Sequence, residues 1–177
     1  MSEVTPNYSV IIGLGNPGPT YYKTRHNIGF RVVDALCEKY GGVWKQKENY
    51  LFSEILIQDK KFLLLKPQTG MNLSGAVVPK LKKMGYELSD ILAVYDEMEK
   101  PFGAVQLRLG GSHRGHNGVR SLMEHGDGFW RLRFGIGRPA QKSDVAEYVL
   151  APFTQDEEAI MDEKIVESIA AIEKTIQ

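Results

Sequence analysis

The sequence predicts an α/β fold in which helices flank a twisted mixed β-sheet within a single domain. The first observation is that apolar strand patterns alternate with helical patterns along most of the chain. The second is that three strand patterns follow one another within residues 43–66, which makes part of the sheet antiparallel. The third is that no repeat, low-complexity tract or linker interrupts the 177 residues. We therefore expect residues 1–177 to form one domain.

The first half of the chain carries four strand patterns and two helical patterns. The strand patterns lie at residues 8–14, 43–47, 50–58 and 61–66, and the helical patterns lie at residues 28–40 and 73–85. Asn27 directly precedes the first helical pattern and belongs to the residue types that cap helices, and Gly41 and Gly42 end that pattern. A glycine-rich turn should therefore connect the first strand to the first helix.

The second half of the chain repeats this alternation. Strand patterns lie at residues 91–95, 104–109 and 130–136, and helical patterns lie at residues 119–125, 145–150 and 155–176. Residues 130–136 alternate apolar and basic side chains, which predicts a half-exposed strand. The last helix has an apolar face that should pack on the rest of the fold, formed by Ile160, Ile165, Ile169 and Ile172.

The composition is that of an ordinary globular protein. Hydrophobic residues make up 42% of the chain and charged residues 25%, and no apolar stretch is long enough for a membrane-spanning helix. Residues 1–7 do not suit a signal peptide. The single cysteine, Cys37, lies among apolar neighbours, so we expect a buried thiol and no internal disulfide. These features predict a cytoplasmic protein with no membrane partner.

Charge is unevenly distributed in a chain whose net charge is zero. Residues 1–99 carry a balance of +1, residues 100–142 of +6 and residues 143–177 of −7. The central basic segment is compatible with a polyanion-binding face. On charge alone, however, a solvated surface that the acidic C-terminal segment offsets is the simpler interpretation.

A glycine motif in the first turn raises the possibility of dinucleotide binding. Gly13, Gly15 and Gly18 match G-x-G-x-x-G after an apolar run, but that pattern also needs a helix that starts among the glycines. Pro17 and Pro19 prevent such a helix, because proline disfavours helix at the preceding residue and cannot join a helix interior. The sequence therefore argues against a nucleotide-binding oxidoreductase.

Polar residues instead gather in four predicted loops after strand ends, where active sites of α/β sheets form. They are Asn16 and His26 in the first loop, Asn72 in the second, Asp96 in the third, and His116 and Asn117 in the fourth. A histidine can accept a proton from water near neutral pH, and a carboxylate on its second ring nitrogen orients it. We therefore expect His26 to act as a base that Asp96 orients.

Simpler interpretations remain open for these residues. A loop histidine is more often solvated than catalytic, and each asparagine can serve as a turn or capping residue. The sequence has no G-x-S-x-G nucleophile motif, which favours an activated water over a covalent intermediate. His26, His113, His116 and Asp96 have no familiar metal-ligand spacing, so we expect no metal site.

Several motifs taken together resemble those of bacterial peptidyl-tRNA hydrolases. They cover nearly the whole chain in order: residues 13–18, Tyr21 and residues 24–29; Lys66-Pro67, Thr69 and residues 71–75; Gly110-Gly111, residues 115–118 and Ser121; and residues 131–133, 135–139, 149–150 and Phe153. Several motifs in register are far more specific than any one of them. The resemblance implies a monomeric α/β enzyme without metal or organic cofactor. Such an enzyme hydrolyses the ester between a peptide and the terminal ribose of tRNA.

The resemblance also implies roles for individual residues. The catalytic residues would be His26 as general base, Asp96 as its partner, and Asn16. Substrate binding would involve Tyr21, Met71, Asn72, His116 and Asn117, of which Asn117 would hold the attacking water. Contacts to phosphates of the tRNA acceptor arm would come from Arg108, Arg131, Arg133 and Lys142.

Three positions depart from the family pattern. Gly70 stands where the family usually has an aromatic residue, residues 95–99 differ from the usual run around the acid, and His113-Arg114 replace smaller residues. None removes a catalytic position. The alternative function is a non-catalytic RNA-binding relative of the same fold. The absence of a predicted transit peptide argues against that alternative.

Overall fold

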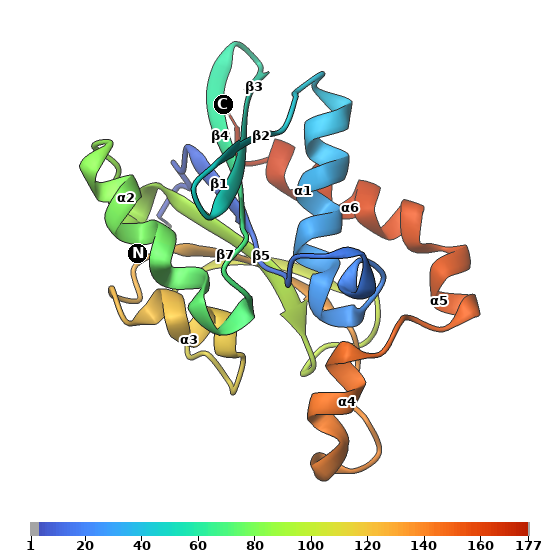
Figure 1. Ribbon diagram of the computed structural model, residues 1–177. Helices are drawn as coiled ribbons and strands as arrows, with labels where there is room; N and C mark the ends of the chain where they lie inside the picture. Colours follow the sequence, from blue (N-terminus) through green and yellow to red (C-terminus); the bar gives the residue numbers. More distant parts are fainter. Residues whose placement is uncertain (1–3, 177) are drawn as a thin grey trace.

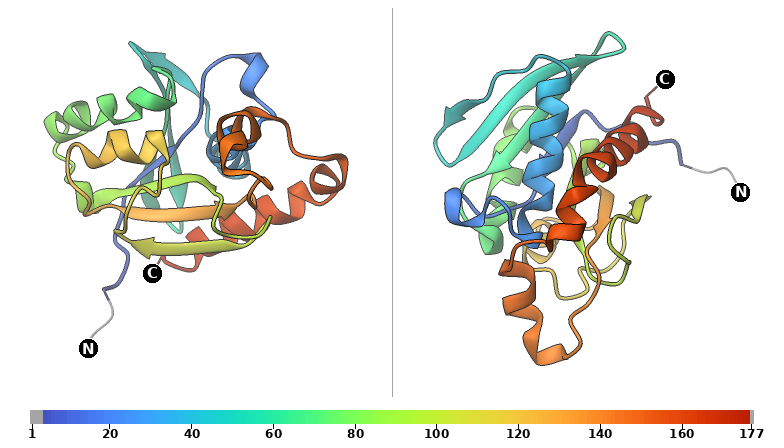
Figure 2. Two further views of the ribbon diagram at one scale, coloured as in Figure 1. Left: turned by 90° about the horizontal axis from the view of Figure 1, so that it is seen from below. Right: turned by 90° about the vertical axis from the view of Figure 1, so that its right-hand side faces the viewer.

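A computed structural model describes residues 4–176 and shows a seven-stranded mixed sheet with helices on both faces (Figures 1 and 2). The strands are β1 (Val10–Gly13), β2 (Lys45–Lys47), β3 (Tyr50–Ile57), β4 (Lys60–Pro67), β5 (Ile91–Glu97), β6 (Val105–Leu109) and β7 (Trp130–Gly135). Their order is β2-β3-β4-β1-β5-β7-β6. Strands β4, β1, β5 and β7 are parallel, and β2, β3 and β6 are antiparallel to their neighbours. The predicted fold class is confirmed.

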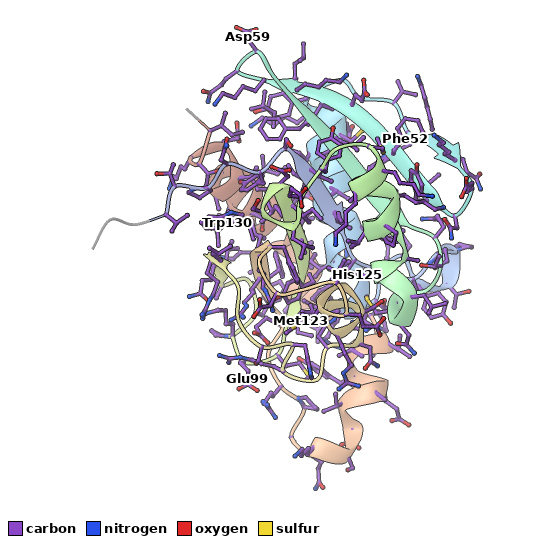
Figure 3. The ribbon with its side chains drawn as sticks, turned by 90° about the vertical axis from the view of Figure 1, so that its left-hand side faces the viewer. Phe52, Asp59, Glu99, Met123, His125 and Trp130 are labelled. Carbon is purple, nitrogen blue, oxygen red and sulfur yellow. The ribbon has the colours of Figure 1, made fainter. Side chains whose placement is uncertain are left out.

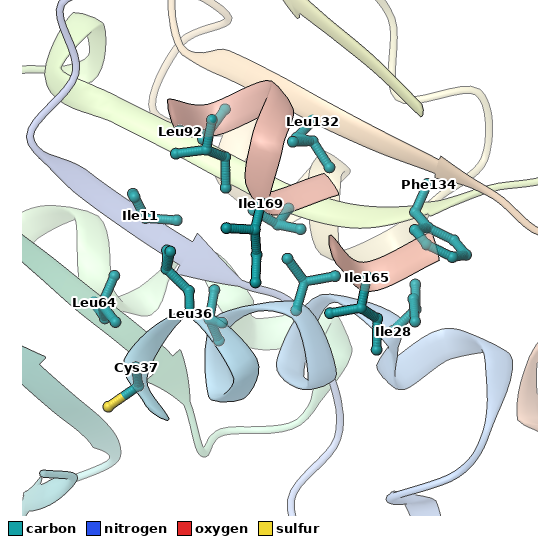
Figure 4. Packing of buried hydrophobic residues seen from close by; sticks show 14 of the residues in the cluster. Ile11, Ile28, Leu36, Cys37, Leu64, Leu92, Leu132, Phe134, Ile165 and Ile169 are labelled. Atoms are coloured by element: carbon teal, nitrogen blue, oxygen red, sulfur yellow. The ribbon is translucent and has the colours of Figure 1, made fainter. Parts of the chain in front are cut away.

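Two apolar cores lie on the two faces of this sheet. The helices are α1 (Ile28–Lys39), α2 (Val78–Lys83), α3 (Asn117–Met123), α4 (Val145–Leu150), α5 (Gln155–Ala159) and α6 (Met161–Glu173). Helices α1 and α6 cover one face, where Ile11 and Leu92 contribute to the core (Figure 4). Helices α2 and α3 cover the other face, where Phe52 and Met123 pack against the second core (Figure 3). Because side chains alternate along a buried strand, β1 supplies both cores.

A close approach between α1 and the sheet fixes the position of the first polar loop. A side chain at Gly29 would begin 2.2 Å from the carbonyl oxygen of Val94 and 2.7 Å from the backbone nitrogen of Leu14. Only glycine therefore allows the first turn of α1 to lie against β1 and β5. This contact holds the preceding 3₁₀ turn η2 (Arg25–Asn27) at the carboxyl end of both strands.

The prediction of a half-exposed strand at residues 130–136 was wrong. Strand β7 lies between β5 and β6, and all of its residues are buried. Leu132 and Phe134 join the first core. Arg131 and Arg133 point to the opposite face, where the loop after β6 covers them. The alternating pattern correctly indicates which side chains share a face, but it does not show that a distant loop covers the basic one.

Two of the predicted helices are interrupted. The pattern at residues 73–85 forms a 3₁₀ segment, η3 (Met71–Val77), with non-helical angles at Leu73, followed by α2. The pattern at residues 155–176 divides into α5 and α6 at Ile160 (φ −114°, ψ 10°). Ile160 is 42% exposed, contrary to the prediction, and Met161 is buried beside the break. Among residues 4–176, we find no helix with the length and apolar character needed to cross a membrane.

Candidate active site

The predicted polar loops meet in one cleft of about 760 Å³ at the carboxyl end of β1 and β5. Its lining includes most of the residues predicted to be catalytic or to bind substrate: Asn16, His26, Met71, Asn72, Asp96, His116 and Asn117. Tyr21 is the exception. It lies in the 3₁₀ turn η1 (Pro19–Tyr21), is 36% exposed and is not part of the cleft lining. A substrate contact of Tyr21 therefore stays a prediction from the family resemblance.

His26 and Asp96 form a buried pair. Nδ1 of His26 lies 3.0 Å from Oδ2 and 3.1 Å from Oδ1 of Asp96. Because a carboxylate only accepts hydrogen bonds, Nδ1–H is the donor and Nε2 carries the free lone pair. Burial acts to lower the pKa of His26, but the charge and hydrogen bond of Asp96 outweigh it, so this pKa lies above the usual 6.5. The ring is therefore oriented and made more basic.

Asp96 receives a second hydrogen bond from His116. Nε2 of His116 lies 2.8 Å from Oδ1 of Asp96, and the ring centroids of His26 and His116 are 4.8 Å apart. Burial acts to raise the pKa of Asp96, but the charges and hydrogen bonds of the two histidines hold it well below its usual value. The carboxyl group is therefore ionised at any pH at which His26 can act as a base.

A pair of carboxamides shapes the first loop. The backbone nitrogen of Asn16 donates to Oδ1 of Asn27 at 2.8 Å, and Nδ2 of Asn27 donates to the carbonyl oxygen of Asn16 at 2.8 Å. Asn27 occupies the N-cap position of α1, as predicted, but its side chain makes no capping hydrogen bond there and instead holds the backbone of Asn16.

Asn16 in turn connects the first two loops. Its Oδ1 accepts a hydrogen bond from the backbone nitrogen of Met71 at 2.7 Å. This bond uses the oxygen of the amide, so Nδ2 is the part left to act as a donor in the cleft. Asn72 and Asn117 are exposed in the same lining. The cleft therefore offers neutral amide groups next to the histidine base.

The cluster of His26, Asp96 and His116 does not suit a metal ion, although one ligand atom of each lies within 4.8 Å of the others. Nδ1 of His116 accepts hydrogen bonds from the backbone nitrogens of Gly118 (3.1 Å) and Val119 (3.3 Å). The ring proton must then be on Nε2, the nitrogen that faces Asp96, and a protonated nitrogen cannot bind a metal. The donor set thus favours hydrogen bonding within the trio.

The four basic residues predicted to contact tRNA lie in different environments. Arg108 and Lys142 are exposed, and Lys142 lines the cleft. Arg131 is fully buried, donates from Nη1 to the carbonyl oxygen of Ser112 at 2.9 Å and stacks on the ring of Phe129. Its burial removes the support for a phosphate contact.

Arg133 is also buried, but it lies close to Arg108, the exposed arginine of β6. Its Nε donates to the hydroxyl of Tyr95 at 3.3 Å, and its Nη1 lies 3.7 Å from Oε1 of Glu97. The guanidinium groups of Arg133 and Arg108 both lie against Gly111. Arg133 therefore adds positive charge close to Arg108, while Tyr95 and Glu97 hold its side chain in place.

The departures from the family pattern fall at the edge of the cleft. Gly70 has a φ of +90°, and the only described atom within 4 Å of a side chain there would be Oδ1 of Asn16. His113 accepts a hydrogen bond from the backbone nitrogen of Gly115 at 2.9 Å, and Arg114 is exposed in the cleft lining. Gly70 thus leaves open space, and Arg114 adds a cation that was not among the predicted site residues.

Helix α4 forms a further wall of the cleft, which the sequence did not indicate. Val145, Ala146, Val149 and Leu150 line it. Arg25 fastens this helix: Nη1 donates to the carbonyl oxygen of Tyr148 at 3.2 Å, and the guanidinium lies 4.0 Å from the centroid of the Tyr148 ring. Arg25, the residue next to His26, thus holds α4 in its place at the cleft.

Comparisons with known proteins agree with this site. The profile of the peptidyl-tRNA hydrolase family matches residues 10–177. The peptidyl-tRNA hydrolase of Sulfurimonas denitrificans is 44% identical over 165 residues, which are 93% of this chain and 88% of that protein. The peptidyl-tRNA hydrolase of Geobacter metallireducens is 49% identical over 154 residues, which are 85% and 79%.

Solved structures show the same fold. The crystal structure of peptidyl-tRNA hydrolase from Acinetobacter baumannii matches with a TM-score of 0.87 and 40% identity, over 93% of this chain and 86% of that one. A peptidyl-tRNA hydrolase in complex with n-propanol matches with a TM-score of 0.92 and 38% identity, over 99% and 92%. The fold and the comparisons define a hydrolase whose single domain has an α/β architecture. The chain belongs to the peptidyl-tRNA hydrolase family, as its motifs predict.

Proposed function

We propose that this hydrolase cleaves the ester between a peptide and the 3′-terminal ribose of tRNA, and so recycles tRNA from prematurely released peptidyl-tRNA. The observation that carries the proposal is the pairing of His26 with Asp96 in an open cleft lined by carboxamides. Nε2 of His26 takes a proton from a water molecule as the water oxygen bonds to the ester carbon. Asp96 stabilises the imidazolium that forms.

The same histidine completes the reaction. The bond between the carbonyl carbon and the ribose oxygen breaks, and the imidazolium of His26 returns its proton to that oxygen. The products are a peptide acid and tRNA with a free hydroxyl. Amide donors of Asn16 and Asn72 stabilise the carbonyl oxygen as it gains negative charge, and Asn117 positions the water. No cofactor enters these steps.

The tRNA surface follows from the distribution of cations around the cleft. We assign phosphate contacts to Arg108 and Lys142 and add Arg114 because it lines the cleft. Arg133 is buried close to Arg108 and adds positive charge to this surface. Phosphate contacts carry little sequence information, which suits an enzyme that must accept the acceptor arms of many tRNAs. A monomeric state and a cytoplasmic location stay predictions from the sequence.

Replacement of the base tests the proposal. The variant His26→Ala should lose roughly 10²–10⁴-fold in turnover, because general-base catalysis typically contributes that much. Its affinity for tRNA should remain near that of the parent, since the phosphate contacts lie elsewhere. The measurement is single-turnover release of peptide from an N-acylated aminoacyl-tRNA, alongside equilibrium tRNA binding. His125→Ala is the matched control.

The measurements of peptide release and of tRNA binding together distinguish a hydrolase from a non-catalytic RNA-binding relative. Residual turnover of His26→Ala within tenfold of the parent rules out the proposed base. Intact tRNA binding by a parent protein that releases no peptide points to the non-catalytic RNA-binding relative.

A further inference from the structure

His116 lines the cleft, but all of its polar atoms are used inside the protein. Nδ1 accepts hydrogen bonds from the backbone nitrogens of Gly118 and Val119 in the first turn of α3. Nε2 lies 2.8 Å from Oδ1 of Asp96. An imidazole has only these two polar atoms. A hydrogen bond from His116 to substrate would therefore break one of these internal bonds.

The backbone donors also determine where the ring proton lies. Two N–H groups point at Nδ1, so this nitrogen must carry a lone pair and the proton must be on Nε2. From Nε2 the proton points at Asp96, which can only accept it. Asp96 thus receives N–H groups from both sides, from Nδ1 of His26 and from Nε2 of His116.

We propose that His116 is a positioning residue: α3 fixes its Nε2–H tautomer, and this N–H holds the Asp96 carboxylate in the orientation that supports His26. The inference rests on the proposed function of His26. It revises the expectation from family resemblance that His116 binds substrate. Only the ring itself remains for contact with substrate.

Close packing on three sides keeps this arrangement rigid. A side chain at Gly118 would begin 2.4 Å from Sδ of Met71 and 3.1 Å from Cε1 of His116, so a larger residue there would displace one of these two side chains. The ring of Tyr95 packs edge-on against His116, with centroids 5.1 Å apart. The buried carboxylate is itself only 3% exposed. A change in the orientation of His116 therefore reaches Asp96 directly.

The charged groups around the trio determine the expected pH effect. The titratable side chains in contact with Asp96 are His26 and His116, with Tyr95 packed behind His116. Glu97 is near Arg133, and Arg114 and Lys142 lie in the cleft lining. Without the hydrogen bond from His116, the negative charge of Asp96 is less neutralised and attracts the protonated form of His26 more strongly. The imidazolium form of His26 is then favoured, so the base form appears only at higher pH.

Two substitutions at position 116 test the hydrogen bond to Asp96 and the hydrogen bonds from α3 one at a time. In His116→Asn the amide oxygen can replace Nδ1 as the acceptor for α3, but the side chain is too short to reach Asp96. In His116→Gln the amide N–H can replace Nε2–H, but the acceptor for α3 is lost. We measure kcat, KM and the pH profile of kcat/KM for both variants, with His113→Asn as the control.

The expected result is specific to a positioning role. His116→Asn should lower kcat at least tenfold, leave KM within threefold and move the rising limb of the pH profile to higher pH. His116→Gln should restore the limb to its parental position. A rise in KM with unchanged kcat and pH profile would overturn the proposal and indicate a substrate ligand.

A measurement on the parent protein removes the dependence on activity and on the folding of variants. With ¹⁵N-labelled histidine, the ring nitrogens of His116 should show a protonated Nε2 and an unprotonated Nδ1 at neutral pH. A protonated Nδ1 with a bare Nε2 contradicts the inference even if the hydrolase proposal holds. Absence of peptide release with the expected tautomer contradicts the proposed function alone.

Discussion

At the scale of single residues, the chemistry depends on one buried carboxylate between two imidazoles. Asp96 is 3% exposed and His26 is 9% exposed, so their charges interact through protein rather than bulk water. Burial and the carboxylate act on the pKa of His26 in opposite directions, and the carboxylate prevails. Catalysis as a general base requires the neutral ring, so activity should rise with pH through this elevated pKa.

Removal of the carboxylate charge should reverse the sign of that shift. In Asp96→Asn the burial of His26 remains while the attraction that raises its pKa is lost. The rising limb of kcat/KM should therefore move to lower pH, while the maximal rate falls roughly a hundredfold or more because the base is weaker and less well oriented. A pH–rate profile in single turnover, together with an NMR titration of His26, provides the check. A limb that stays in place would show that Asp96 does not set this pKa.

At the scale of elements, the site depends on two attachments to the turn that contains His26. Gly29 lets α1 lie against the sheet, which positions His26 beside Asp96. Arg25 reaches to α4, whose own residues are all at least partly exposed. The helix therefore has little buried apolar surface and relies on the guanidinium of Arg25, which also lies 3.5 Å from Glu157.

We expect Arg25→Met to loosen α4 and weaken substrate binding. Loss of buried hydrogen bonds from a charged donor costs about 1.5–3 kcal/mol, so KM should rise roughly tenfold or more while the chemical step changes less. Arg31→Met is the matched control. Arg31 forms a similar ion pair with Glu158, but Glu158 belongs to α5, so this pair does not attach α4. Steady-state kinetics and amide hydrogen exchange of residues 145–150 measure the two effects. Equal changes in both variants would assign the effect to general stability.

The elements also show what the sequence can and cannot predict. The order of strands and helices follows from short-range periodicity, and the polar loops could be grouped because they follow strand ends. The covered face of β7 and the attachment of α4 could not be predicted. They depend on contacts between residues far apart in the chain, such as Arg131 with Ser112 and Arg25 with Tyr148. The role of His116 depends on hydrogen-bond direction, which motif spacing does not encode.

At the scale of the whole molecule, a neutral chain concentrates cations near the cleft. Residues 100–142 carry a balance of +6 and residues 143–177 a balance of −7. Burial of Arg131 and Arg133 removes two of these cations from direct contact with solvent. Arg108, Arg114 and Lys142 remain exposed, and two of them line the cleft. Position rather than net charge should therefore determine tRNA affinity.

Salt dependence of tRNA binding distinguishes position from net charge. Arg108→Gln, Arg114→Gln and Lys142→Gln should each weaken binding and reduce the slope of log K against log salt by about 0.7–0.9, the amount expected for one lost phosphate contact. Lys82→Gln removes the same charge from the exposed face of α2 and should leave the slope unchanged. Binding of tRNA that carries no amino acid or peptide, measured at several salt concentrations, gives the slopes. If all four variants change the slope equally, tRNA responds to the overall charge of the protein and the proposed surface is wrong. If only Lys82→Gln changes the slope, the proposed surface is also wrong and the acceptor arm lies along α2.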